Sequence, residues 1–165
     1  MTTAVLGLGN PLLTDDGVGL VLLEAVREAG PWDAGVELVD GGTWGLSLLP
    51  VLTDSDRVLV LDAVRAGAAP GAVLRGSGAD IPRLYRFPLS PHQIDLTEVL
   101  GAADLLGVTP AEVQVVGVEP ASVEGPCVQL TACVADSVPR ALREALAVLA
   151  GWGHTPVGVA ATAGK

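Results

Sequence analysis

The chain has 165 residues and a formal net charge of −10, with 9 Lys and Arg residues against 19 Asp and Glu residues. This balance argues against a nucleic-acid partner and against a membrane surface, because both present anionic groups that bind clustered basic side chains. Half of the residues are hydrophobic, yet the aromatic ones are only three Trp, one Tyr and one Phe, which predicts an aliphatic core of the kind that buries parallel strands between helices.

The length favours a single domain with a core of its own. No apolar run reaches the roughly 18 residues that a membrane-spanning helix needs. The N-terminus enters a strand pattern almost at once without a basic leader, so we expect a soluble, cytoplasmic protein, and a monomer. Cys127 and Cys133 have no second pair to form a zinc site or a disulfide framework, and we interpret both as reduced thiols.

Strand-like and helix-like segments alternate along the chain. Strands are predicted at Ala4–Leu8, Val36–Val39, Arg57–Leu61, Gly71–Arg75 and Val113–Val118. Helices are predicted at Gly17–Ala29, Thr43–Leu52, Leu96–Leu106 and Leu130–Ala150, with Pro50 and Pro139 as points of kinking or shortening and a long surface loop over Gly76–Pro91. The alternation predicts one three-layer α/β/α domain over residues 1–150, with a mainly parallel, twisted five-stranded sheet, and a flexible tail over residues 151–165.

The segment VLGLGNPLLTDDGVG, from Val5 to Gly19, combines an apolar strand, a glycine turn and two acids. Asp15 and Asp16 fall where a helix is expected to begin, and a helix N-terminus favours negative charge. Such a place suits holding a cation or activating water and repels a phosphate. Asp15 is best interpreted as a cap of the helix, whereas capping and function remain equally open for Asp16.

Other polar residues are expected at the same edge of the sheet. Asp40 follows the second strand, and Asp62 ends the buried strand VLVLD, where an acid needs a partner or a metal. Ligands bind outside the carboxyl ends of parallel strands, and His92 can reach this edge from its loop. Two acids and an imidazole form a ligand set suited to a divalent ion such as zinc or nickel.

The string GLGNPL partly matches the glycine motif of dinucleotide-binding sites. It carries the first two glycines of G-x-G-x-x-G, but Leu12 stands where the third is expected. Asp40 has the spacing of a ribose-binding acid, so spacing alone leaves a dinucleotide site open, although Asp15 and Asp16 would repel pyrophosphate. The start of the string resembles peptidyl-tRNA hydrolases, but the histidine of their catalytic element is missing here.

Five elements in order resemble the hydrogenase maturation endopeptidases, which trim the large subunit of nickel–iron hydrogenases. They are GLGNPLLTDDGVG (Gly7–Gly19), DGGT (Asp40–Thr43), LVLDAV (Leu59–Val64), SPHQ (Ser90–Gln93) and VGVEP (Val116–Pro120). The resemblance implies a twisted sheet between helices, with Asp16, Asp62 and His92 as the catalytic and metal-contacting trio. It further implies that Asp40, Gly41, Gly42 and Asn10 shape the substrate cleft.

The implied reaction is removal of a C-terminal peptide from the large-subunit precursor after nickel has been loaded. The implied nickel is carried by the substrate, and no tightly held metal of the enzyme's own is expected. A metal-bound water or a carboxylate acting as general base would each serve the hydrolysis, and the sequence leaves both open. The alternatives are a non-catalytic nickel-sensing maturation chaperone and a nucleotide-binding oxidoreductase.

Overall fold

The computed structural model describes residues 1–88 and 95–157. Its centre is a five-stranded sheet with the spatial order β2-β1-β3-β5-β4. The strands are β1 (Thr3–Leu8), β2 (Val36–Gly42), β3 (Arg57–Ala63), β4 (Val73–Ser77) and β5 (Glu112–Val118). β1 pairs in parallel with β2 and β3, β3 pairs in parallel with β5, and β4 runs antiparallel at the edge beside β5. The predicted mainly parallel five-stranded sheet is therefore confirmed.

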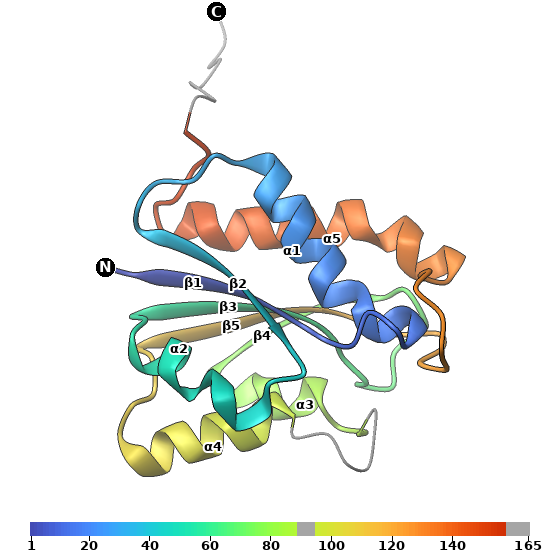
Figure 1. The fold of residues 1–165 in the computed structure, drawn as a ribbon, viewed down its shortest axis with the longest axis horizontal. Helices are drawn as coiled ribbons and strands as arrows, with labels where there is room; N and C mark the ends of the chain where they lie inside the picture. The colour runs from blue at the N-terminus through green and yellow to red at the C-terminus, as the bar shows by residue number, and fades with distance from the viewer. Residues whose placement is uncertain (89–94, 158–165) are drawn as a thin grey trace, which may run out of the picture.

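Helices cover both faces of the sheet, as Figure 1 shows. α1 (Val18–Ala29) and α5 (Ala132–Gly151) lie on one face, and α2 (Leu49–Thr53), α3 (Ile81–Leu84) and α4 (Leu96–Leu106) lie on the other. Short 3-10 turns, η1 (Thr14–Gly17), η2 (Gly45–Leu48) and η3 (Gly78–Asp80), precede α1, α2 and α3. This is the expected three-layer arrangement, in which each helix buries its apolar side against the sheet.

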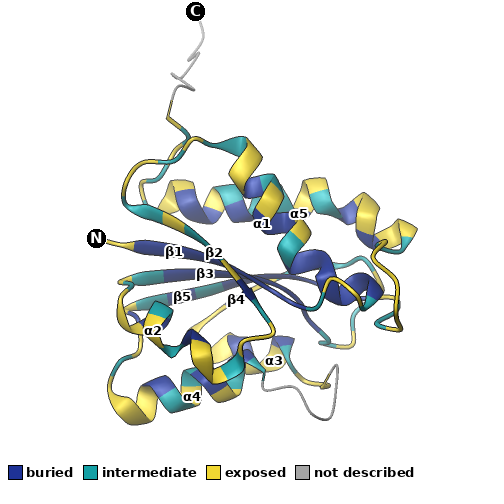
Figure 2. Ribbon diagram, viewed as in Figure 1, coloured by how far each residue is buried: buried dark blue, intermediate teal, exposed yellow. Residues whose placement is uncertain are grey.

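The core consists of two aliphatic layers separated by the sheet. Alternate residues of each strand point to opposite faces, so β1 sends Leu6 into the layer under α2 and α4 and Val5 into the layer under α1 and α5. Both side chains are fully buried, and Figure 2 shows the central strands dark with burial along most of their length. With so few aromatic residues, Val, Leu and Ala fill the space, as the composition predicts.

Two helical segments differ from the sequence expectation. The predicted loop over Gly76–Pro91 contains the end of β4, η3 and α3, because Ile81 and Leu84 bury their side chains against the sheet despite Pro82. α5 begins at Ala132, two residues later than predicted, and contains Pro139, so the proline does not shorten the helix. No helix among residues 1–88 and 95–157 is long and apolar enough to cross a membrane.

The beginning of the predicted tail contacts the domain as far as residue 157. His154 Nε2 lies 2.9 Å from Thr3 Oγ1, and His154 Nδ1 lies 3.0 Å from a carboxylate oxygen of Asp33. The backbone N–H of Val157 donates to the carbonyl of Pro31 at 2.6 Å. The rest of the predicted tail, residues 158–165, lies outside the described residues.

Candidate functional site

The turn after β1 places Asp16 inside the molecule. Gly9 makes this turn with φ +122°, and a Cβ on it would lie 1.8 Å from the carbonyl oxygen of Asp16, so only glycine fits. Asp16 is 2% exposed, and its Oδ2 accepts a hydrogen bond from the backbone N–H of Asn10 at 2.9 Å. Its other oxygen, Oδ1, is buried without a hydrogen-bond partner among the described residues. Such an unpaired acceptor is costly unless a ligand completes it.

Asp62 lies within β3, opposite Gly117 of β5, and is 8% exposed. The hydroxyl of Tyr85 donates a hydrogen bond to Asp62 Oδ2 at 2.9 Å. Burial raises the pKa of Asp62 to about 8, and the nearby charge of Asp16 adds to the rise, against the lowering effect of the Tyr85 hydrogen bond. Burial likewise raises the pKa of Asp16. Two carboxyl groups whose charged forms are disfavoured by burial therefore lie close together.

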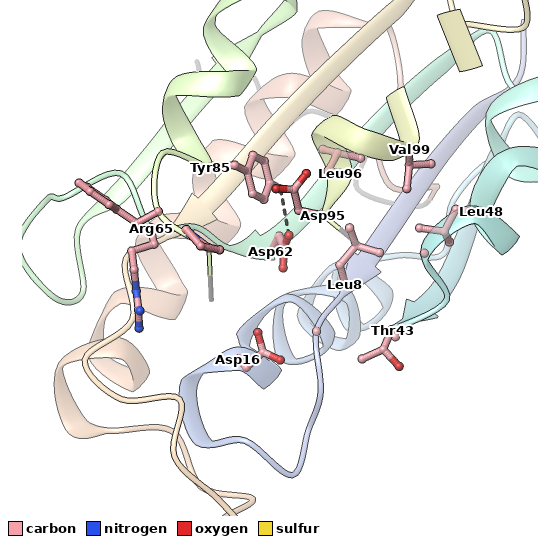
Figure 3. Close-up of a pocket in the computed structure, with 15 residues that line it drawn as sticks. Leu8, Asp16, Thr43, Leu48, Asp62, Arg65, Tyr85, Asp95, Leu96 and Val99 are labelled. Carbon is pink, nitrogen blue, oxygen red and sulfur yellow. Dashed lines mark hydrogen bonds between the residues drawn. The ribbon is translucent and has the colours of Figure 1, made fainter. Parts of the chain in front are cut away.

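These two acids line one narrow pocket of about 50 Å³ at the carboxyl end of β1 and β3. In Figure 3 the carboxyl groups of Asp16 and Asp62 border the same opening, Asp62 from the strand and Asp16 from the turn before α1. The pocket is completed by apolar and small residues from β1, from the end of β2 and the turns after it, and from α4, among them Leu8, Gly42, Thr43, Leu48, Leu96 and Val99. A cation or a polarised water held here would face two carboxylates in apolar surroundings.

Arg65 and Asp95 also line this pocket. The guanidinium of Arg65 makes no hydrogen bond or ion pair with the residues that the structure describes. Glu119, 5% exposed, braces the loop after Arg65 by accepting backbone N–H bonds from Ala66 at 2.9 Å and Ala68 at 3.3 Å. Asp95 caps α4 by accepting the N–H bonds of Thr97 and Glu98, so one of its oxygens already has a structural role.

Asp15 faces away from the pocket and has a structural role. Although it is fully buried, backbone N–H groups of Ala121, Ser122 and Thr131 donate to it at 2.9, 3.0 and 2.7 Å, and the Thr131 hydroxyl adds further bonds. Asp15 therefore ties the start of α1 to the loop before α5. The adjacent Asp16 has only one such bond. The sequence prediction that Asp15 caps the following helix misses this partner loop, which lies more than 100 residues further along the chain.

The four residues expected to shape a substrate cleft do not all line this pocket. Gly42 lines it, and Asn10 contributes the backbone N–H that binds Asp16. Gly41 is buried, and a Cβ there would meet Leu6, Leu8 and Leu48 within about 3 Å. Asp40 is exposed and lines a separate groove beside α1.

His92 lies outside the described residues, so its place beside Asp16 and Asp62 stays a prediction from the sequence. Within residues 1–88 and 95–157, no group of three His, Cys, Asp or Glu side chains is arranged to hold a metal ion. Among the described residues of the expected trio, Asp16 and Asp62 are the two whose carboxylate oxygens could bind a metal ion in the pocket. Cys127 and Cys133 are both free thiols and exposed.

Sequence reasoning did not identify Tyr85, Arg65 or Asp95 as pocket residues. Tyr85 follows α3, which the sequence presents as irregular chain, so nothing in the pattern places its hydroxyl against β3. Arg65 offers a weak signal, since it comes two residues after the end of β3, the strand that carries Asp62. A single basic residue just after the apolar run VLVLDAV is a sequence signal that could have placed a positive charge at the pocket.

The burial of Asp62 predicts an unusual pH dependence of stability. Its pKa is raised to about 8 in the folded protein, against 3.8 as the ordinary value, so between these two pH values the folded state holds a proton that the unfolded state has released. The free energy of unfolding is therefore expected to fall as pH rises through this window, at up to about 1.4 kcal/mol per pH unit. Chemical denaturation of the metal-free protein from pH 5 to pH 8 measures this slope.

The matched variant for this measurement is Asp62→Asn, which has the same shape and no titration. Exposed carboxyl groups whose pKa is lowered, such as Asp33 and Asp56, titrate below the window and leave it undisturbed. We expect the stability of the variant, relative to wild type, to increase with pH. Parallel pH profiles of the two proteins would contradict the raised pKa of Asp62.

Comparison with known proteins gives one consistent family. The model of the hydrogenase maturation protease family matches residues 21–148. The hydrogenase 2 maturation protease of Escherichia coli K12 is 37% identical over 150 residues, covering 90% of this chain and 91% of the relative. The hydrogenase expression/formation protein HupD of Rhodobacter capsulatus is 35% identical, covering 90% and 71%. The solved hydrogenase maturating endopeptidase HybD of E. coli superposes with a TM-score of 0.86 at 36% identity, covering 94% of this chain and 96% of that one. With this fold and this paired-acid pocket, the chain belongs to the hydrogenase maturation protease family, whose members are peptidases.

Proposed function

We propose that this chain is an endopeptidase that removes a C-terminal peptide from the nickel-loaded large-subunit precursor of a nickel–iron hydrogenase. Asp16 and Asp62 contact the nickel that the precursor carries, together with His92 as assigned from the sequence. The observation that carries the proposal is the pair of buried acids lining one pocket, with Asp16 Oδ1 lacking any partner in the described part of the chain.

The electrostatics of the pocket support a cation as part of the substrate. Burial raises the pKa of both Asp16 and Asp62, so ionising either carboxyl group costs free energy when no cation is bound. A divalent ion offsets that cost for both at once. Two carboxylates without a thiolate bind nickel weakly. They can therefore contact a nickel ion that the precursor still holds without removing it.

The same pocket supplies what peptide hydrolysis needs. Once a cation offsets the cost of charging Asp62, its carboxylate can accept a proton from the attacking water as a general base. Tyr85 holds Asp62 Oδ2, which leaves Asp62 Oδ1 for the attacking water or the ion. A nickel-bearing precursor would thus complete both the binding site and the electrostatics, so that processing waits for nickel loading.

The test compares nickel-loaded and nickel-free precursor as substrates of the purified chain. We expect the loaded precursor to shorten at its C-terminus, detected by intact-protein mass spectrometry, and the nickel-free precursor to stay intact. A stable complex with the loaded precursor without cleavage would instead identify a nickel-sensing chaperone. Equal cleavage of both precursors would contradict the role of nickel in recognition.

A further inference from the structure

A second groove lies beside the catalytic pocket, on the α1 side of the sheet. Its volume is about 320 Å³, against about 50 Å³ for the pocket of Asp16 and Asp62. The residues that define this second groove include Leu20, Val21, Glu24, Asp40, Val128 and Leu130. By this measure the second groove is the roomier of the two and lies in the size range of sites for short peptide segments.

The two hollows are neighbours along three separate segments of the chain. Residues 8–11, 14–17 and 40–43 each contribute to both: Leu8, Asp16 and Gly42 line the pocket, while Pro11, Gly17 and Asp40 line the second groove. The same three segments therefore separate the two hollows. A polypeptide with its scissile bond beside Asp16 and Asp62 has to cross only these segments to reach the second groove.

The walls of the second groove are fixed by backbone hydrogen bonds and include exposed apolar side chains. The segment that carries Val128 is held beside the turn of η1, since Cys127 N–H donates to Leu12 at 2.9 Å and Thr14 N–H donates to Cys127 at 2.8 Å. Val128 is nevertheless 74% exposed and Val21, on α1, is 41% exposed. Large apolar side chains exposed on a fixed surface beside an active site indicate a binding surface.

The charge of the second groove is negative. Its lining includes three charged side chains, Glu24, Asp40 and Arg27. Arg27 pairs with Glu24 in the same helix, whereas the carboxylate of Asp40 forms no ion pair with the residues that the structure describes. The chain as a whole carries −10. A segment with apolar side chains and at least one Lys or Arg would complement this surface.

We propose that the second groove binds the C-terminal tail of the precursor, the part released by cleavage, in an extended conformation with an apolar side chain against Val21 and Val128 and a basic side chain at Asp40. This inference rests on the proposed function, because it takes the precursor as substrate. The catalytic pocket contacts the nickel and the scissile bond, and the second groove contacts the tail that follows. Asp40, predicted from the sequence to bind substrate, acquires this role outside the catalytic pocket.

The experiment measures steady-state cleavage of nickel-loaded precursor by Val21→Lys and Asp40→Asn, with Leu105→Lys as matched control. Leu105 is 88% exposed near the C-terminal end of α4 and lines neither hollow. Its variant therefore introduces the same positive charge at a surface position where no effect on tail binding is expected. We expect KM to rise about tenfold in Val21→Lys and in Asp40→Asn, with a much smaller change in kcat, and no change in Leu105→Lys. The effect of Asp40→Asn is expected to weaken with added salt.

A fluorescent synthetic peptide of the tail provides a readout that needs no cleavage. Its fluorescence anisotropy is expected to report binding to wild type and to Leu105→Lys, and about tenfold weaker binding to the two groove variants. Unchanged KM and unchanged peptide binding in both variants would overturn the tail site while leaving the proposed function intact. A change in oligomeric state on Val21→Lys, seen by size-exclusion chromatography, would overturn it by identifying a second copy as the occupant. Failure of wild type to cleave the precursor, with the peptide still bound, would reject the proposed function alone.

Discussion

Asp62→Asn is expected to lower precursor processing by about three orders of magnitude without unfolding the protein. Asparagine has the shape of aspartate and still accepts the hydrogen bond of Tyr85, but it neither accepts a proton from water nor brings a negative charge to a cation. Since burial raises the pKa of Asp62 to about 8, the native carboxyl group costs stability at neutral pH. The variant is therefore expected to be at least as stable as wild type in thermal denaturation, with its activity measured on nickel-loaded precursor.

Asp15→Asn is the contrasting control, because it changes the neighbouring acid in the same way. The carboxylate of Asp15 accepts backbone N–H bonds from Ala121, Ser122 and Thr131, and an amide cannot accept at both of its ends. We expect this variant to lose stability, by about 2 kcal/mol, and to retain activity in the molecules that remain folded. Wild-type processing by Asp62→Asn would show that this carboxylate is not catalytic.

Most of the fold is predictable from the sequence because local patterns determine it. α4 is found at Leu96–Leu106, as predicted, since an Asp–Glu capping box begins it and a left-handed Gly107 ends it. β3 is predicted from its uninterrupted apolar run, although it continues two residues further, to Ala63. The short α3 is missed because its stability comes from burial of Ile81 and Leu84 against the sheet, which is a tertiary effect without a local signal.

The two acids of the pocket, Asp16 and Asp62, are predictable to the extent that strand topology places them. Asp16 and Asp62 follow or end adjacent parallel strands, so the rule on carboxyl ends brings both to one pocket. What the sequence does not reveal is which side of the sheet each polar side chain faces. Asp40 lies opposite Gly7 on the next strand and belongs to the second groove, because the alternation along β2 directs Gly41, not Asp40, toward Leu48.

The second large effect is on stability: Gly19→Ala is expected to destabilise the protein by about 3 kcal/mol or more. A Cβ on Gly19 would lie 2.2 Å from the carbonyl oxygen of Leu8 and 2.3 Å from that of Leu61. Both obstacles are backbone atoms of β1 and β3 in the centre of the sheet, so neither can rotate away as a side chain does. α1 has to move outward, and the measurement is the midpoint of chemical denaturation.

Gly101→Ala separates this packing effect from helix propensity, because Gly101 lies within α4 and a Cβ there meets nothing within 4 Å. In that open position alanine is expected to stabilise the protein by about 0.5–1 kcal/mol, the opposite sign to Gly19→Ala. Since Gly19 comes three residues after Asp16, the displacement of α1 also moves Asp16 relative to Asp62. Processing by folded Gly19→Ala is therefore expected to fall together with its stability, whereas Gly101→Ala keeps the wild-type rate. If both variants changed stability alike, close approach of α1 to the sheet would not be what holds Asp16 and Asp62 at one pocket.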